Sequence, residues 1–153
     1  MHFTALPTPE VRALQKGGLD ANNQPAELAV SDGGGNPCRH CLKDIPEGVE
    51  MLVLGHRPFS APQPYAEVGP LFLCADECAS GSGSELPEIL RSSPDYLLKA
   101  YDARERIIYG TGAIVPASDI GAYAAKLLAQ DNVAFVHVRS ARNNCYQLRI
   151  DRS

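Results

Sequence analysis

Apolar residues recur along most of this chain with the short period of β-strands. The clearest run is EMLVLGHR at residues 50–57, where apolar side chains fall on both faces of an extended segment. A strand that is apolar on both faces is typical of the centre of a sheet. Runs rich in β-branched and aromatic residues, each bounded by turn residues, predict further strands. These lie at residues 28–30, 71–73, 96–101, 107–115, 133–139 and 146–150.

Two pairs of these strands are close enough in sequence to form hairpins. The pair that begins at residue 96 turns at residues 102–105. The pair that begins at residue 133 turns at residues 141–144, which include two asparagines that tolerate a left-handed conformation. The pattern therefore predicts a mostly antiparallel sheet.

Two segments follow the longer period of an α-helix. The main one covers residues 118–130, where Ser118 is a candidate N-cap. A shorter helix is predicted at residues 8–17, with Thr8 as its cap and Gly17 as a left-handed stop. The apolar face of the main helix consists of Ile120, Ala124, Leu127 and Leu128.

The length of 153 residues and an apolar share of 44% suit one domain with one core. The chain has no internal repeat and no linker between domains, and its serine–glycine run at residues 80–84 predicts a flexible surface loop. We therefore expect a single compact α+β domain over residues 1–153, with a mostly antiparallel sheet and one main helix at about 118–130.

Charge and hydropathy exclude several classes of function. A net charge of −4 argues against nucleic-acid binding by phosphate neutralisation. The longest apolar runs, such as residues 51–54, are far shorter than the about 20 residues of a membrane-spanning helix. The N-terminus lacks the charged and apolar regions of a secretory signal, so a cytoplasmic protein is expected.

Four of the five cysteines form two closely spaced pairs. Cys38 and Cys41 are separated by two residues, and Cys74 and Cys78 by three, with 32 residues between the pairs. A C-x-x-C turn can direct two thiolates at one ion about 2.3 Å away, and thiolate-rich tetrahedral sites select zinc over hard cations. In a reducing cytoplasm, metal binding explains such pairs better than disulfides do. The sequence predicts a structural zinc site on these four residues.

Other interpretations of these cysteines remain, and one is that they are four unrelated reduced thiols. A redox-active Cys38–Cys41 pair would leave Cys74 and Cys78 as ordinary core thiols. An iron–sulfur cluster is a weaker alternative, because the spacings match neither ferredoxin pattern well. His40 lies inside the first pair and is a candidate replacement ligand or a neighbour of the metal.

His137 and Arg139 are two apart on a predicted strand, so their side chains point to the same face. With the turn predicted above, Arg139 lies opposite Tyr146 and His137 lies opposite Leu148. Both side chains then lie on an apolar face, where a guanidinium without a partner costs free energy. An anion in a pocket, or a buried carboxylate such as Glu67, would satisfy Arg139. A shift of one residue in the register would reverse these faces.

Arg57 and Tyr65 flank a proline-rich segment and complete a candidate pocket for a small anionic ligand, formed with His137 and Arg139. The favoured function is a zinc-stabilised binding or accessory protein. One alternative is an enzyme that uses His137 and Arg139 on a small anionic substrate, and another is a thiol redox protein. Cys145 is a weak candidate nucleophile, because the predicted register places it and His137 on opposite faces.

Several short segments, in their order along the chain, resemble one bacterial family. They are NPCRHCL at 36–42, RPF at 57–59, QPYAE at 63–67, GP at 69–70, VHVR at 136–139 and CY at 145–146. In these segments the chain is similar to the family catalogued as domain of unknown function 1203. That name implies no activity, so the resemblance gives a relationship without a function.

Overall fold

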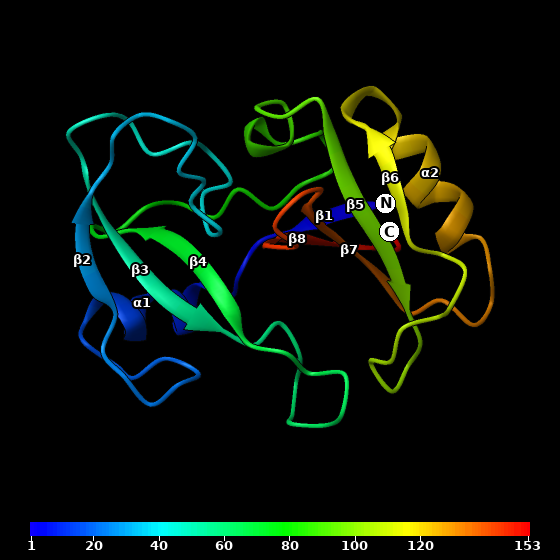
Figure 1. Cartoon of the computed structure of the whole chain (residues 1–153), viewed down its shortest axis with the longest axis horizontal. Coiled ribbons are helices and arrows are strands. Elements are labelled where there is room, and N and C mark those ends of the chain that lie inside the picture. The colour runs from blue at the N-terminus through cyan, green and yellow to red at the C-terminus, as the bar shows by residue number, and fades with distance from the viewer.

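Eight strands form two antiparallel sheets in the computed structural model, which describes residues 1–153. The larger sheet has the strand order β1-β8-β7-β5-β6, and the smaller one has the order β2-β3-β4. Figure 1 shows the small sheet on one side of the molecule and the large sheet on the other. The strands are β1 (His2–Thr4), β2 (Glu27–Val30), β3 (Glu50–His56), β4 (Gly69–Cys74), β5 (Asp95–Tyr101), β6 (Ala113–Pro116), β7 (Phe135–Ser140) and β8 (Tyr146–Asp151). The predicted α+β class is confirmed, with two sheets.

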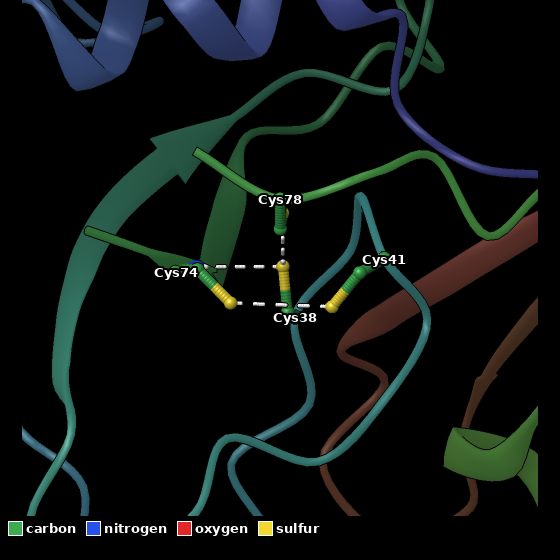
Figure 2. A group of neighbouring side chains, drawn as sticks. All are labelled: Cys38, Cys41, Cys74 and Cys78. Atoms are coloured by element: carbon green, nitrogen blue, oxygen red, sulfur yellow. Dashed lines mark hydrogen bonds between the residues drawn. The ribbon is translucent and has the colours of Figure 1, made fainter. Parts of the chain in front are cut away.

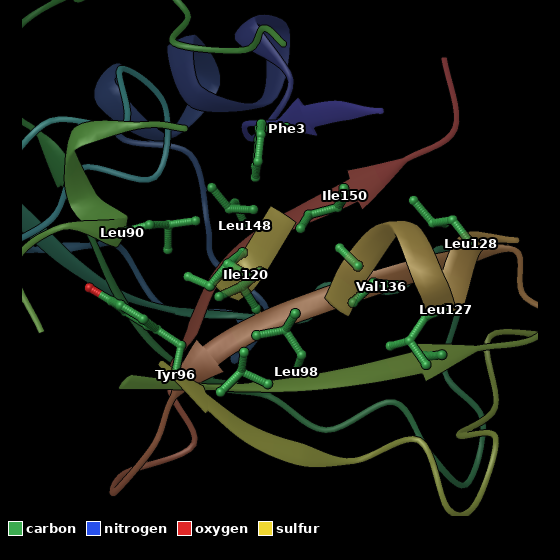
Figure 3. Packing of buried hydrophobic residues seen from close by; sticks show 14 of the residues in the cluster. Phe3, Leu90, Tyr96, Leu98, Ile120, Leu127, Leu128, Val136, Leu148 and Ile150 are labelled. Atoms are coloured by element: carbon green, nitrogen blue, oxygen red, sulfur yellow. The ribbon is translucent and has the colours of Figure 1, made fainter. Parts of the chain in front are cut away.

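The large sheet is covered on one face by helix α2 (Ile120–Leu128), which contacts β5, β6 and β7. Its predicted apolar face is buried, in a core cluster of 18 residues (Figure 3). A 3-10 turn, η2 (Ala117–Asp119), precedes the helix, so α2 is shorter than predicted. The Ser118 hydroxyl donates to the Asp119 carboxylate and caps no backbone amide, so the predicted cap is wrong.

The second strand of the first hairpin is shorter than the predicted 107–115. Only Ile107 forms a bridge to β5 before the chain turns away, with Gly110 at a φ of 88°. The hydroxyl of Thr111 then accepts a hydrogen bond from the amide of Ala100 at 3.1 Å. A side chain thus replaces a strand carbonyl at this point, and regular pairing resumes only at β6.

The hairpin of β7 and β8 has the predicted pairing next to its turn and a different pairing beyond it. Arg139 lies opposite Tyr146, as predicted. A β-bulge immediately before Arg139 then shifts the register, and His137 lies opposite Arg149 instead of Leu148. A bulge adds one unpaired residue to one strand, so a uniform alternation cannot predict it.

The small sheet packs against helix α1 (Thr8–Gln15), and β3 occupies the predicted central position. Val11 and Leu14 of α1 are buried in a second core cluster of ten residues. The helix ends before Gly17, which has a left-handed φ of 92°, as predicted. Thr8 is the first helical residue and makes no cap, so that prediction is wrong.

Two connections tie the sheets together. Leu6, between β1 and α1, donates its amide to the Arg39 carbonyl at 3.0 Å. Phe3 of β1 exchanges two backbone hydrogen bonds with Gly83, at 2.7 and 3.0 Å. The serine–glycine run was predicted as a flexible loop, but the structure shows it held to the large sheet. A short turn, η1 (Glu88–Leu90), follows and adds to the large core.

Neither α-helix has the length and apolar character to cross a membrane.

Candidate metal centre

The first cysteine pair lies on a tight turn between the two cores. The amide of Leu42 donates to the Cys38 carbonyl at 2.9 Å, and the amide of Cys38 donates to the Lys43 carbonyl at 3.0 Å. Leu42 has a left-handed φ of 56°. The side chain of Cys38 belongs to the small core and that of Leu42 to the large one. The turn therefore directs both thiols to one side while it anchors itself in both halves of the molecule.

The second pair is positioned by β4 and by helix α1. Cys74 is the last residue of β4, and Cys78 lies in the loop that follows. Gln15 of α1 donates its amide to the carbonyl of Cys74 at 2.9 Å, and Arg12 donates to the carbonyl of Cys78 at 2.6 Å. Two α1 side chains therefore hold the loop that carries the second pair of thiols.

The four Sγ atoms of Cys38, Cys41, Cys74 and Cys78, the four-cysteine cluster, lie within 4.8 Å of one another (Figure 2). Cys38 and Cys78 are 3.9 Å apart, and so are Cys41 and Cys74. Four bonds of about 2.3 Å to a tetrahedral ion place neighbouring sulfurs about 3.8 Å apart. The geometry of the cluster therefore fits a single tetrahedral metal ion.

Hydrogen bonds stabilise negative charge on two of the sulfurs. The amide of Cys74 donates to Cys38 Sγ at 3.3 Å. His40 Nδ1 lies 3.2 Å from Cys78 Sγ, and its Nε2 lies 2.8 Å from the Thr8 hydroxyl. A sulfur acceptor requires the hydrogen on Nδ1, so the Thr8 hydroxyl donates to Nε2. His40 thus lies beside the candidate ligands, in the position of residues that orient metal ligands.

Without a metal ion, negative charge on one thiol of the cluster opposes ionisation of the others. Hydrogen bonds from Cys41 and Cys74 lower the pKa of Cys38. Burial, together with the charge that Cys38 then carries, raises the pKa of Cys78 to about 12. A divalent cation would reverse this preference, because it favours all four thiolates and releases their protons.

Gly81, in the segment predicted as a flexible surface loop, packs against the first cysteine pair. A Cβ atom on Gly81 would lie 2.1 Å from the carbonyl oxygen of Cys41, so only glycine fits. Its amide donates to the His40 carbonyl at 2.8 Å. The serine–glycine run packs against the first cysteine pair, and sequence spacing alone carries no signal of that contact.

Arg39 connects the first cysteine pair to the large sheet. Its side chain is 3% exposed, and it donates to the carbonyls of Tyr146 at 2.8 Å and Pro37 at 2.7 Å. Burial lowers the pKa of Arg39 to about 10, so the guanidinium stays charged at neutral pH. Because Tyr146 begins β8, this buried cation links the first cysteine pair to the large sheet.

The structure places the carboxylate of Glu67 against Arg139. Glu67 Oε1 lies 2.5 Å from the Arg139 guanidinium, which is 3% exposed. The same guanidinium donates to the carbonyl of Asn144 at 3.2 Å and to Nδ1 of His137 at 3.1 Å. Arg139 thus has a carboxylate partner in Glu67, although the Glu67 side chain is 42% exposed and not buried as predicted.

The four residues predicted to bind a ligand do not line one pocket. His137 is 1% exposed, packs among aromatic rings and lines neither of the two main cavities. Arg139 lines the smaller cavity of about 230 Å³, whereas Arg57 lines the larger one of about 740 Å³. Tyr65 is hydrogen-bonded to the hydroxyl of Tyr109 at 3.0 Å and lines neither.

Acidification below about pH 6.5 should destabilise the protein through His137. Burial, and then the charge of Arg139, hold the pKa of folded-state His137 well below its usual range. As the pH falls, the unfolded chain therefore binds this proton first. The stabilising contribution of neutral His137 is fully present at a pH above the pKa that His137 has in the unfolded chain. Below that pH, the free energy of unfolding falls by up to about 1.4 kcal/mol per pH unit. Denaturant unfolding between about pH 7.5 and 5.5 measures this slope.

The substitution His137→Gln should reduce the slope by that amount, because it removes the titrating ring. His2→Gln, at an exposed position on β1, is the matched control. A slope that is the same in wild-type protein and in His137→Gln would contradict the prediction.

Together these features define an α+β protein with four cysteines clustered at metal-binding distance. Residues 35–152, which include all five cysteines, match the family described as "Protein of unknown function (DUF1203)". The chain therefore belongs to the DUF1203 family. Neither a curated protein nor a solved structure gives a significant match to it.

Proposed function

We propose that Cys38, Cys41, Cys74 and Cys78 bind one structural Zn²⁺ ion. The observation that carries this proposal is the spacing of the Sγ atoms, with two pairs at 3.9 Å and all four within 4.8 Å. Four protein thiolates leave no open position, which is the pattern of structural rather than catalytic zinc. When bound, the ion would cross-link the first cysteine pair to the end of β4.

We further propose that zinc supports a cytoplasmic protein that binds a small anionic ligand. Reduced thiols suit the cytoplasm. The cavity of about 740 Å³ is within the range of small-molecule sites, and Arg57 lies in its lining. The redox alternative has less support, because Cys38 and Cys41 are each within 3.9 Å of a thiol of the other pair. An enzyme based on His137 also has little support, since that ring lines neither main cavity.

Metal analysis with a count of reactive thiols tests the zinc proposal. The purified native protein should contain about one zinc per chain, with Cys145 as the only freely reactive thiol. After chelation under denaturing conditions all five thiols should react. Replacement of zinc by Co²⁺ should give the strong visible absorption of a tetrahedral thiolate site. Protein without stoichiometric metal, whose five thiols all react in the native state, would refute the proposal.

A further inference from the structure

The larger of the two main cavities is a cleft between the two sheets, with a volume of about 740 Å³. One wall comes from α1 and the segment before it, and another from the end of β3 and the residues that follow. Side chains of β8 complete it. Because both sheets contribute, the cleft depends on how the two halves of the molecule are joined.

Apolar side chains form much of the cleft surface. They come from the segment before α1, from α1, from β3 and from the proline-rich segment that follows β3. They include Leu6, Leu14, Leu54 and Phe59. Such a surface favours an organic ligand with an apolar body over a fully hydrated ion.

Three of the four carboxylates in the cleft are held by hydrogen-bond donors. Asp20 accepts from three backbone amides, including that of Gly55 at 2.8 Å. Glu105 accepts from the amide and hydroxyl of Ser60 at 2.9 and 2.8 Å. Asp151, on β8, is bonded to the Thr4 hydroxyl and to Arg149, each at 2.6 Å.

The fourth carboxylate, Glu10, lies 3.4 Å from Nδ1 of His56. Burial, and then the charges of Arg57 and Arg39, lower the pKa of His56 to about 4, so its ring is neutral at pH 7. Burial also raises the pKa of Glu10. His56 therefore contributes a hydrogen-bonding ring to the cleft but no positive charge.

Arg57 is the one cationic side chain of the cleft without a partner. It takes part in none of the ion pairs of the protein, whereas Arg149 is paired with Asp151. Its Nε atom is buried and has no hydrogen-bond acceptor. A buried guanidinium nitrogen without an acceptor is costly, and a bound carboxylate supplies two acceptors in the geometry that matches arginine.

We infer that the cleft binds an organic carboxylate whose charged group pairs with Arg57 and whose apolar body lies against Leu6, Leu14 and Phe59. This inference rests on the proposed anion-binding function and specifies its ligand class and its place. The three held carboxylates line the rest of the cleft and disfavour a second anionic group on the same ligand. The ligand is therefore a monocarboxylate.

Calorimetric titration of the zinc-loaded protein with three probes tests the inference. They are 4-phenylbutyrate, the neutral 4-phenylbutanol and inorganic phosphate. The carboxylate should bind at least about ten-fold more tightly than either of the others. Arg57→Gln should weaken 4-phenylbutyrate about ten-fold and leave 4-phenylbutanol unchanged. Arg104→Gln, which removes the same charge at an exposed position, should change neither affinity.

Three results would overturn the inference. One is equal affinity for the acid and the alcohol, the second is equal loss of binding in Arg57→Gln and Arg104→Gln, and the third is no binding of 4-phenylbutyrate. Zinc content measured on the same samples separates this inference from the zinc proposal. Zinc-loaded protein that fails to bind the acid contradicts only the ligand, whereas protein without zinc contradicts the metal site whatever it binds.

Discussion

Removal of the proposed zinc ion from the four-cysteine cluster should lower the free energy of unfolding by at least about 4 kcal/mol, or about 10 °C in Tm. The apparent free energy of zinc binding at structural sites, about 10–16 kcal/mol, is as large as the whole stability of a typical domain. The loss should concentrate in the small sheet, because Cys38 lies in its core and the other three cysteines pack against that core. Thermal unfolding with and without a chelator measures the total effect.

Hydrogen exchange shows which part of the protein loses stability when zinc is removed. Amides of β3 and β4 should lose protection in metal-free protein, while those of β5 and β7 should keep most of theirs. Cys38→Ser should reproduce the effect of the chelator. Cys145→Ser is the matched control, since Cys145 lies outside the cluster. Equal stability of the two variants, together with a chelator that changes nothing, would contradict this expectation.

Removal of the Glu67 carboxylate should destabilise the protein more than removal of its partner Arg139. Glu67→Ala leaves a guanidinium that is 3% exposed without its carboxylate. Breaking a fully buried pair costs about 3–5 kcal/mol. The Glu67 side chain is 42% exposed, so water can partly replace it and we expect about 2–3 kcal/mol. Arg139→Met should cost less, about 1–2 kcal/mol, because Glu67 is free to reach water and the loss is limited to the hydrogen bonds that Arg139 donates to His137 and Asn144.

A double-mutant cycle measured by denaturant unfolding tests this asymmetry. The double variant Glu67→Ala/Arg139→Met should be about as stable as Arg139→Met alone, since Glu67 has no other role there. The exposed pair of Arg142 and Asp95 is the matched control. Asp95→Ala should cost less than about 1 kcal/mol. Additive losses in the Glu67 and Arg139 cycle would show that this ion pair contributes nothing specific.

Helix α1 takes part in both proposed sites. Arg12 and Gln15 hold the loop of the second cysteine pair, while Glu10 and Leu14 line the cleft. The proposed zinc would therefore support one wall of the cleft through this helix.

Local sequence patterns determined several features of this protein. Each cysteine pair is short enough for its spacing to predict a shared metal site, and the periodicity at residues 118–130 predicted the buried face of α2. The requirement that a buried guanidinium have a partner predicted either a bound anion or a carboxylate such as Glu67, which lies 72 residues before Arg139 in the chain. These features follow from short-range geometry or from the chemistry of one side chain.

Tertiary structure decided the rest. The division into two sheets, the fit of Gly81 against Cys41 and the cleft at Arg57 all depend on segments that are distant in sequence. The bulge before Arg139 changed the partner of His137, because one unpaired residue shifts all the pairs beyond it. Periodicity reports which side of an element is apolar. Which other segment covers that side depends on packing of the whole chain, and for this reason the residues around the four-cysteine cluster and the cleft emerged only from the fold.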